Sequence, residues 1–122
     1  MKKLVISLKT PTEALEDFKG ALIRAKKKKG NVEPHFEIAF DNKQDFDRFV
    51  KNISVLICIQ ALKPRSVYEL AKITGMDQSN LNKLILFFEE IGAVKIRESK
   101  VKGRAVKTPI VEYQKIEFDL AA

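Results

Sequence analysis

The residues best suited to recognition chemistry in this chain are polar side chains grouped at the start of one segment. They are Gln78, Ser79, Asn80, Asn82 and Lys83. Glutamine and asparagine can each form two hydrogen bonds with the edge of an adenine, and lysine can reach a guanine or a phosphate. This grouping therefore indicates a surface that recognises a polar partner.

The same segment has the apolar pattern of a helix packed on one side. At about 100° per residue, five large apolar side chains share one face: Leu81, Leu84, Ile85, Phe88 and Ile91. Asp77 is placed to cap this helix and Gly92 to end it. The polar residues then occupy its opening turns, as they do in a recognition helix that enters the major groove of DNA.

A shorter helix is predicted immediately before it. Ser66 and Glu69 have the spacing of a capping box, and Pro64 ends the segment that precedes them. The small Ala71 leaves room for a steeply crossing helix, and Gly75 permits a sharp turn. We predict a helix-turn-helix here, with Ser66 among the DNA-binding residues.

A basic hairpin is predicted after the second helix. "AVKIRES" reads as a strand, "KVKGRAVKTP" as a turn around Gly103, and "IVEYQKIEFDL" as one or two returning strands. A helix-turn-helix followed by such a hairpin predicts a winged helix, whose wing follows phosphate or enters the minor groove. Its candidate DNA contacts are Lys100, Lys102 and Arg104.

Charge and composition limit the kinds of partner and chemistry. The 122 residues carry a formal net charge of +7, and residues 95–107 hold six basic residues against one acidic residue. A positive surface attracts polyanions, so nucleic acid is the leading expected partner. Together with the winged-helix pattern, this makes double-stranded DNA the expected partner. A single cysteine, Cys58, excludes an internal disulfide and a multi-cysteine zinc site. We expect no catalysis, cofactor or metal, because the chain has one histidine, no glycine-rich phosphate loop and no paired carboxylates with a plausible cleft.

The N-terminal third alternates between strand and helix patterns. Leu4, Ile6 and Leu8 are predicted to face inward from a first strand, and a second strand is predicted over Phe36–Phe40. Between them a helix is expected from a cap at Thr10 to a stop at Gly30. The lysine run at its end suits a helix C-terminus better than a dedicated nucleic-acid patch.

Two further helices are predicted before the helix-turn-helix. One starts after Asn42, and the other is "ISVLICIQAL", an apolar segment expected to be buried on more than one side. The expected fold is α+β: a winged helix-turn-helix over residues 43–122, including a C-terminal strand, preceded by a strand-helix-strand dimerisation element over residues 1–42. The two form one cooperative unit. The short apolar runs predict no membrane span or signal peptide, so a cytoplasmic homodimer is expected.

The stretch "SVYELAKITGMDQSNLNKLILFFEEIGAV" and the closing "YQKIEFDL" resemble a family of small prokaryotic predicted transcriptional regulators, winged-helix relatives of the MarR group. The resemblance extends from about Phe36 to Leu120. It implies a dimeric DNA-binding regulator, most simply a repressor. Some members are encoded beside a TumE-like toxin and are described as antitoxins, so it also implies a toxin as a second partner.

Three alternatives stay open at this level. The chain is an antitoxin that represses its own operon, an RNA-binding or architectural protein without base readout, or a helical hairpin whose polar face contacts only water. Members of the family often carry polar or small residues where this chain has Leu84, Leu86 and Phe87. Leu86 points away from the apolar face and Phe87 lies at its flank. Of three candidate covers, the N-terminal helix, a dimer mate and a toxin, we expect the helix or the mate. DNA is a poor candidate, because both residues lie past the opening turns of the helix and only a thymine methyl would favour such a contact.

Overall fold

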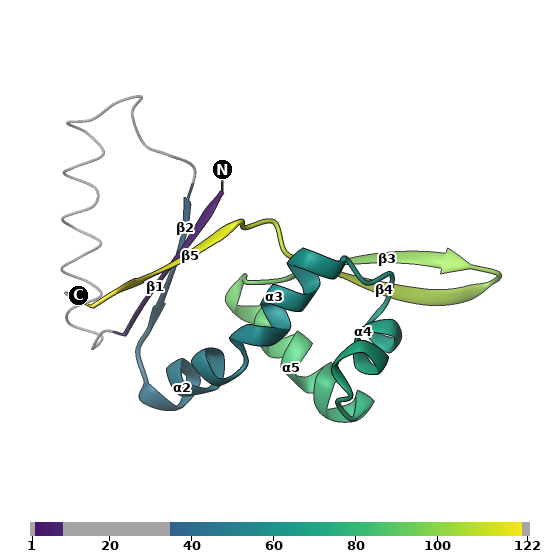
Figure 1. Ribbon diagram of the computed structural model, residues 1–122, viewed down its shortest axis with the longest axis horizontal. Helices are drawn as coiled ribbons and strands as arrows, with labels where there is room; N and C mark the ends of the chain where they lie inside the picture. Colours follow the sequence, from purple (N-terminus) through teal and green to yellow (C-terminus); the bar gives the residue numbers. More distant parts are fainter. Residues whose placement is uncertain (1, 9–34, 121–122) are drawn as a thin grey trace. The chain divides into compact units, whose positions relative to one another are not determined.

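The computed structural model describes residues 2–8 and 35–120. Over these residues the fold is α+β, with four helices and five strands in two sheets (Figure 1). The predicted helix from Thr10 to Gly30 lies outside the described residues. The chain divides into two units, residues 1–50 with 113–122 and residues 51–112. The C-terminal strand belongs to the first unit because it pairs with the first strand.

The first unit is built on a three-stranded parallel sheet. Its strands are β1 (Lys3–Leu8), β2 (His35–Phe40) and β5 (Lys115–Asp119), in the order β2-β1-β5. Leu4 and Ile6 of the central strand are buried, as predicted. The inward placement predicted for Leu8 is wrong, since its side chain is 38% exposed. Leu8 is the last residue of β1; it pairs with Phe40 of β2 and has no register partner on β5.

Helix α2 (Lys43–Lys51) follows the sheet, as predicted. It begins after Asn42, whose Oδ1 accepts a hydrogen bond of 2.8 Å from the backbone N–H of Asp45. Phe49 is fully buried, and its ring centroid lies 5.7 Å from that of Phe40 on β2. Aromatic pairs at this spacing stabilise a fold beyond the burial of their apolar area, so Phe49 anchors α2 to the sheet.

The second unit opens with helix α3 (Ile53–Leu62). The expectation that this helix is buried on more than one side is wrong. Val55, Leu56 and Ile59 are buried, but Ile57 and Leu62 are 59% and 57% exposed. Val55, Leu56 and Ile59 share one side of α3, and Ile57 lies outside that side. Leu62 lies on the same side as Val55, but it is the last residue of the helix.

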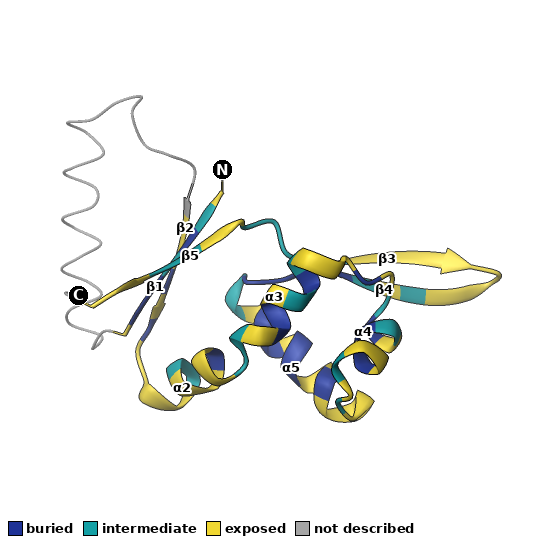
Figure 2. Cartoon of the chain, viewed as in Figure 1, coloured by how far each residue is buried: buried dark blue, intermediate teal, exposed yellow. Residues whose placement is uncertain are grey.

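Helices α4 (Val67–Thr74) and α5 (Gln78–Ile91) complete the core of this unit, and strands β3 (Lys95–Val101) and β4 (Arg104–Ile110) form an antiparallel hairpin. In Figure 2 the dark blue, buried stretches gather on α3, α4 and α5, while most of the hairpin is yellow and exposed. The helical core therefore holds the unit together, and the hairpin is available to a partner.

Candidate nucleic-acid interface

The corner between α4 and α5 is fixed by capping at both helices. Ser66 Oγ accepts a 3.0 Å hydrogen bond from the backbone N–H of Glu69, and Asp77 Oδ2 accepts one of 3.1 Å from Asn80. Gly75 between the helices has φ 73°, a left-handed conformation that glycine adopts without a Cβ clash. These local bonds confirm the predicted caps and turn.

The five polar residues predicted on the opening turns of α5 are all exposed: Gln78, Ser79, Asn80, Asn82 and Lys83. Leu81, Leu84, Ile85 and Phe88 are buried on the opposite face. The predicted division of this helix into a packed face and a free polar face is confirmed. Within the described part of the chain, the side chains of Gln78 and Asn82 accept and donate no hydrogen bond, so their amides are available to a partner.

Leu86 and Phe87 have different surroundings, although they are neighbours in the sequence. Phe87 is 7% exposed and its ring lies 5.8 Å from that of Phe88, whereas Leu86 is 53% exposed. Phe87 is therefore buried and Leu86 is not. The N-terminal helix that was expected to cover both residues lies outside the described residues, and cover by a dimer mate stays a prediction. A leucine left half in water forgoes part of a burial energy of about 1.5–3 kcal/mol.

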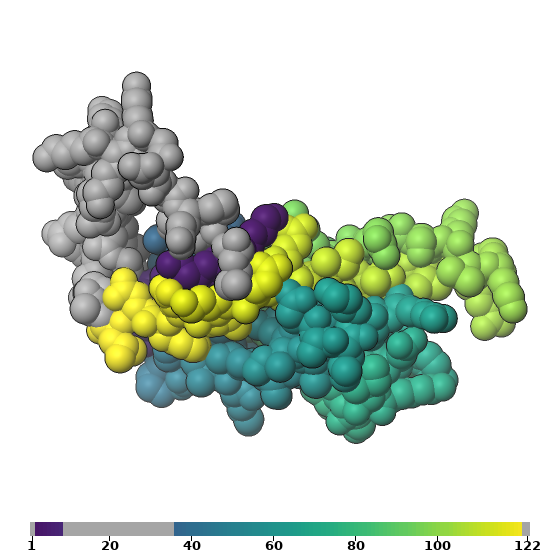
Figure 3. Space-filling model, turned by 45° about the horizontal axis from the view of Figure 1, so that its top comes forward, coloured from purple at the N-terminus to yellow at the C-terminus, as the bar shows by residue number. Residues whose placement is uncertain are grey.

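The hairpin differs from its prediction in one respect. Residues 100–109 were expected to form a basic turn, but strands run through nearly all of them and only Lys102 and Gly103 turn. Both residues have positive φ, 53° and 77°, the signature of a two-residue type I′ turn that matches the twist of paired strands. Figures 1 and 3 show this hairpin reaching beyond the helices of its own unit.

A groove of about 720 Å³ lies between α5, the start of α4 and the hairpin. It brings together four of the predicted DNA-binding residues, Ser66, Gln78, Asn82 and Arg104. The other five do not line it, although each is exposed: Ser79, Asn80, Lys83, Lys100 and Lys102. Residues far apart in the sequence thus meet at one surface, which a duplex could follow with both a helix and a hairpin.

Sequence reasoning missed several residues of this groove. Leu86 and Glu89 continue the line of Gln78 and Asn82 along α5, and Tyr68 and Lys107 enter from α4 and β4. The helical spacing of Gln78, Asn82 and Leu86, each four residues apart, was available as a signal. Lys107 could not be found in this way, because its position depends on the strand register that pairs it with Glu98.

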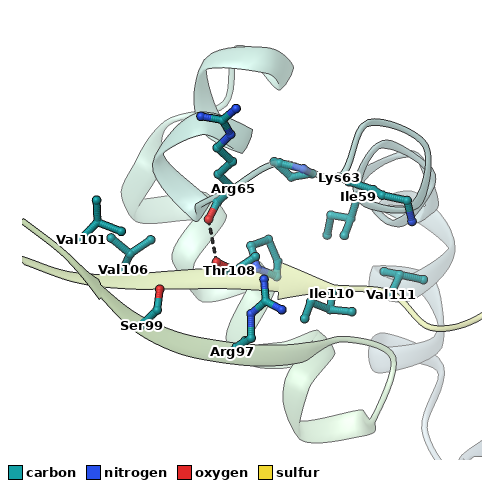
Figure 4. Close-up of a pocket in the computed structure, with 12 residues that line it drawn as sticks. Ile59, Lys63, Arg65, Arg97, Ser99, Val101, Val106, Thr108, Ile110 and Val111 are labelled. Carbon is teal, nitrogen blue, oxygen red and sulfur yellow. Dashed lines mark hydrogen bonds between the residues drawn. The ribbon is translucent and has the colours of Figure 1, made fainter.

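A second cavity, of about 450 Å³, lies on the other face of the hairpin (Figure 4). Its lining mixes apolar side chains, including Ile59 and Ile110, with polar and charged ones, including Lys63 and Arg97. Thr108 Oγ1 donates a 2.7 Å hydrogen bond to the carbonyl oxygen of Arg65, which ties β4 to the turn before α4. This bond fixes the hairpin relative to the helices of the same unit.

Among residues 2–8 and 35–120, no three His, Cys, Asp or Glu side chains group in a way that could hold a metal ion. None of the helices in that part of the chain is long and apolar enough to cross a membrane.

Comparison of the chain with protein-family models, with curated proteins and with solved structures found no match.

Proposed function

We propose that this chain is a sequence-specific DNA-binding transcriptional regulator that acts as a homodimeric repressor. In this proposal α3, α4, α5 and the β3–β4 hairpin form a winged helix-turn-helix, and no residue is catalytic. The observation that carries the proposal is the shared groove, in which the amides of Gln78 and Asn82 face the same space as Arg104 of the hairpin. Amides suit adenine edges and a guanidinium suits phosphate or a narrow minor groove.

In this proposal the start of α5 and the hairpin contact different parts of the DNA. The exposed opening turns of α5 enter the major groove, where Gln78 and Asn82 contact base edges. The hairpin carries Lys100, Lys102 and Arg104 along the phosphate backbone, where they contribute affinity without sequence information. Sequence preference should therefore depend on α5, and salt dependence on the hairpin.

Exposed apolar surface outside the groove supports the homodimer. Ile57 and Leu62 on α3, and Phe36 and Phe118 on the sheet, are each at least 40% exposed. A second copy is the simplest cover for such residues, and a two-fold dimer would place two α5 helices about 34 Å apart, one turn of DNA.

A salt titration tests the proposal. Binding of the full chain to a fluorescently labelled duplex is measured over a range of salt concentrations, for the wild type and for the double variant Lys102→Gln with Arg104→Gln. Each lost phosphate contact flattens the plot of log K against log salt by about 0.9, so the variant should lose a slope of about 2.

A charge-matched control distinguishes the effect of the hairpin residues on the slope from the effect of a lower net charge. Lys43→Gln with Lys51→Gln removes the same two charges from exposed positions on α2. This control should keep most of the wild-type slope. Equal slopes for the hairpin variant and the wild type would remove the hairpin from the binding surface, and an absence of binding by the wild type would end the proposal.

A further inference from the structure

Leu86 lies where a side chain that reads DNA would lie. It is 53% exposed, and it lines the groove together with Gln78 and Asn82. The three residues are spaced by four along α5, so they form one continuous row on its exposed side. We call Gln78, Asn82 and Leu86 the reading row.

The composition of the reading row selects one kind of base pair. Two amides can each bond the N6 and N7 edge of adenine, and the only apolar group that the major groove offers is the C5-methyl of thymine. We infer that the reading row recognises a block of A·T base pairs, with the isobutyl group of Leu86 against a thymine methyl. This inference rests on the proposed function and specifies the DNA that the surface takes.

The dimensions of the row agree with such a block. Gln78 and Leu86 are eight residues apart, which is about 12 Å along a helix at 1.5 Å per residue. Base pairs rise by about 3.4 Å, so the row spans roughly three to four of them. Each side chain can therefore face a different base pair within one block.

The charges around the row are consistent with base contact at its centre. Arg104 and Lys107 line the groove from β4, and Glu98 lies opposite Lys107 in the strand register. Glu89 lies three residues beyond Leu86 and also lines the groove. A carboxylate there disfavours phosphate, so the backbone should pass along the hairpin while bases face the row.

An amphipathic protein helix is the competing occupant of this groove, because Leu86, Ile96 and Tyr68 give it apolar lining. The free amides favour DNA. Gln78 and Asn82 would need polar partners from such a helix, whereas adenine edges supply a donor and an acceptor at each step.

The test begins with selection of duplexes from a random-sequence library by the wild-type protein and by Leu86→Ala. Each thymine of the selected site is then replaced by deoxyuridine, which removes one methyl group and leaves the pairing unchanged. At the thymine that faces Leu86, the wild type should lose affinity about fourfold, the value of one buried methyl group. Leu86→Ala should bind the thymine and deoxyuridine duplexes equally.

A second substitution distinguishes the major groove from DNA shape. Inosine·cytosine pairs resemble A·T in the minor groove but present a guanine-like edge in the major groove. The wild type should bind such duplexes weakly, and Asn82→Ala should reduce its preference for A·T over inosine·cytosine. Both variants change exposed side chains, and deoxyuridine alters only the DNA, so folding does not limit the comparison.

Four results would overturn the inference. A selected site without an A·T block, or an equal deoxyuridine penalty in wild type and Leu86→Ala, leaves DNA binding intact but removes the role of Leu86. Equal binding of A·T and inosine·cytosine duplexes would assign the preference to shape. Failure to enrich any sequence would remove sequence-specific recognition, and the inference with it.

Discussion

Ser66 has a structural role at a position that is also a predicted DNA contact. Ser66 was predicted as a DNA contact, and it also caps α4 through the 3.0 Å bond that its Oγ accepts from the Glu69 N–H. A capping box has two hydrogen bonds, and among the described residues the one from the Glu69 N–H to Ser66 Oγ is formed. Its hydroxyl proton is not used by the cap, so the hydroxyl can still donate to a phosphate.

Removal of the Ser66 cap should lower stability by a known amount. Ser66→Ala leaves the N–H of Glu69 without its partner and should reduce the free energy of unfolding by about 1 kcal/mol. Chemical denaturation measures this change, with Ser99→Ala, at an exposed strand position, as the control. If Ser66→Ala is as stable as the control, the cap contributes nothing.

The sheet of the first unit contains a pH-dependent ion pair. A hydrogen bond from Lys3, 3.3 Å from Nζ to Oε2, holds the pKa of Glu117 below its ordinary value. A lowered pKa stabilises the folded state above the ordinary pKa of the carboxyl, and this stabilisation disappears as the pH falls through the folded pKa. Glu117→Gln should therefore flatten the acid side of the stability profile of the sheet.

Both side chains of this ion pair are partly exposed, so its effect should be small and sensitive to salt. Denaturation at a series of pH values, in low and high salt, measures it. Superimposable profiles for wild type and Glu117→Gln at low salt would contradict the assignment.

At the scale of the element, two glycines with similar conformations hold different parts of the second unit. Gly75 has φ 73° and Gly103 has φ 77°, and a Cβ added at either would meet no atom within 4 Å. Replacement by alanine should therefore introduce only backbone strain, about 1–2 kcal/mol at each position.

The two alanine variants should differ in which element they loosen. Gly75→Ala should reduce hydrogen-exchange protection in α4 and α5, and Gly103→Ala should reduce it only in β3 and β4. Loss of protection in the same amides for both variants would mean that the hairpin and the helices unfold as one element.

Local signals in the sequence were enough to predict α4, α5 and their caps, because Ser66, Gly75 and Asp77 act within a few residues of themselves. The extent of β3 and β4 was missed, because their basic side chains are solvated on both faces and resemble a loop. The order β2-β1-β5 could not be predicted, since β1 and β5 lie at opposite ends of the chain. The separation of exposed Leu86 from buried Phe87 likewise depends on tertiary packing.

At the scale of the whole molecule, the homodimer remains a prediction. Substitutions on two exposed apolar surfaces, one on α3 and one on the sheet, test it. Sedimentation equilibrium at micromolar concentration should give twice the monomer mass. Ile57→Lys with Leu62→Lys would break an interface on α3, and Phe36→Lys with Phe118→Lys would break one on the sheet, because a buried unpaired charge is strongly unfavourable.

Leu86→Lys is the matched control for these variants, because it places the same charge at an exposed leucine that is assigned to DNA. This control should remain a dimer. A wild-type monomer would contradict the homodimer, and dissociation of the control would place Leu86 in the dimer interface.

The central claim, that α5 reads a DNA sequence, is tested most directly by the ratio of two dissociation constants. They are measured at the same salt concentration, for the selected duplex and for a permuted duplex of identical composition. The account predicts that the wild type prefers the selected duplex by at least about 1,000-fold. Asn82→Ala should lose about 1–3 kcal/mol of that preference while binding the permuted duplex as the wild type does. Equal affinity of the wild type for the two duplexes would contradict the claim.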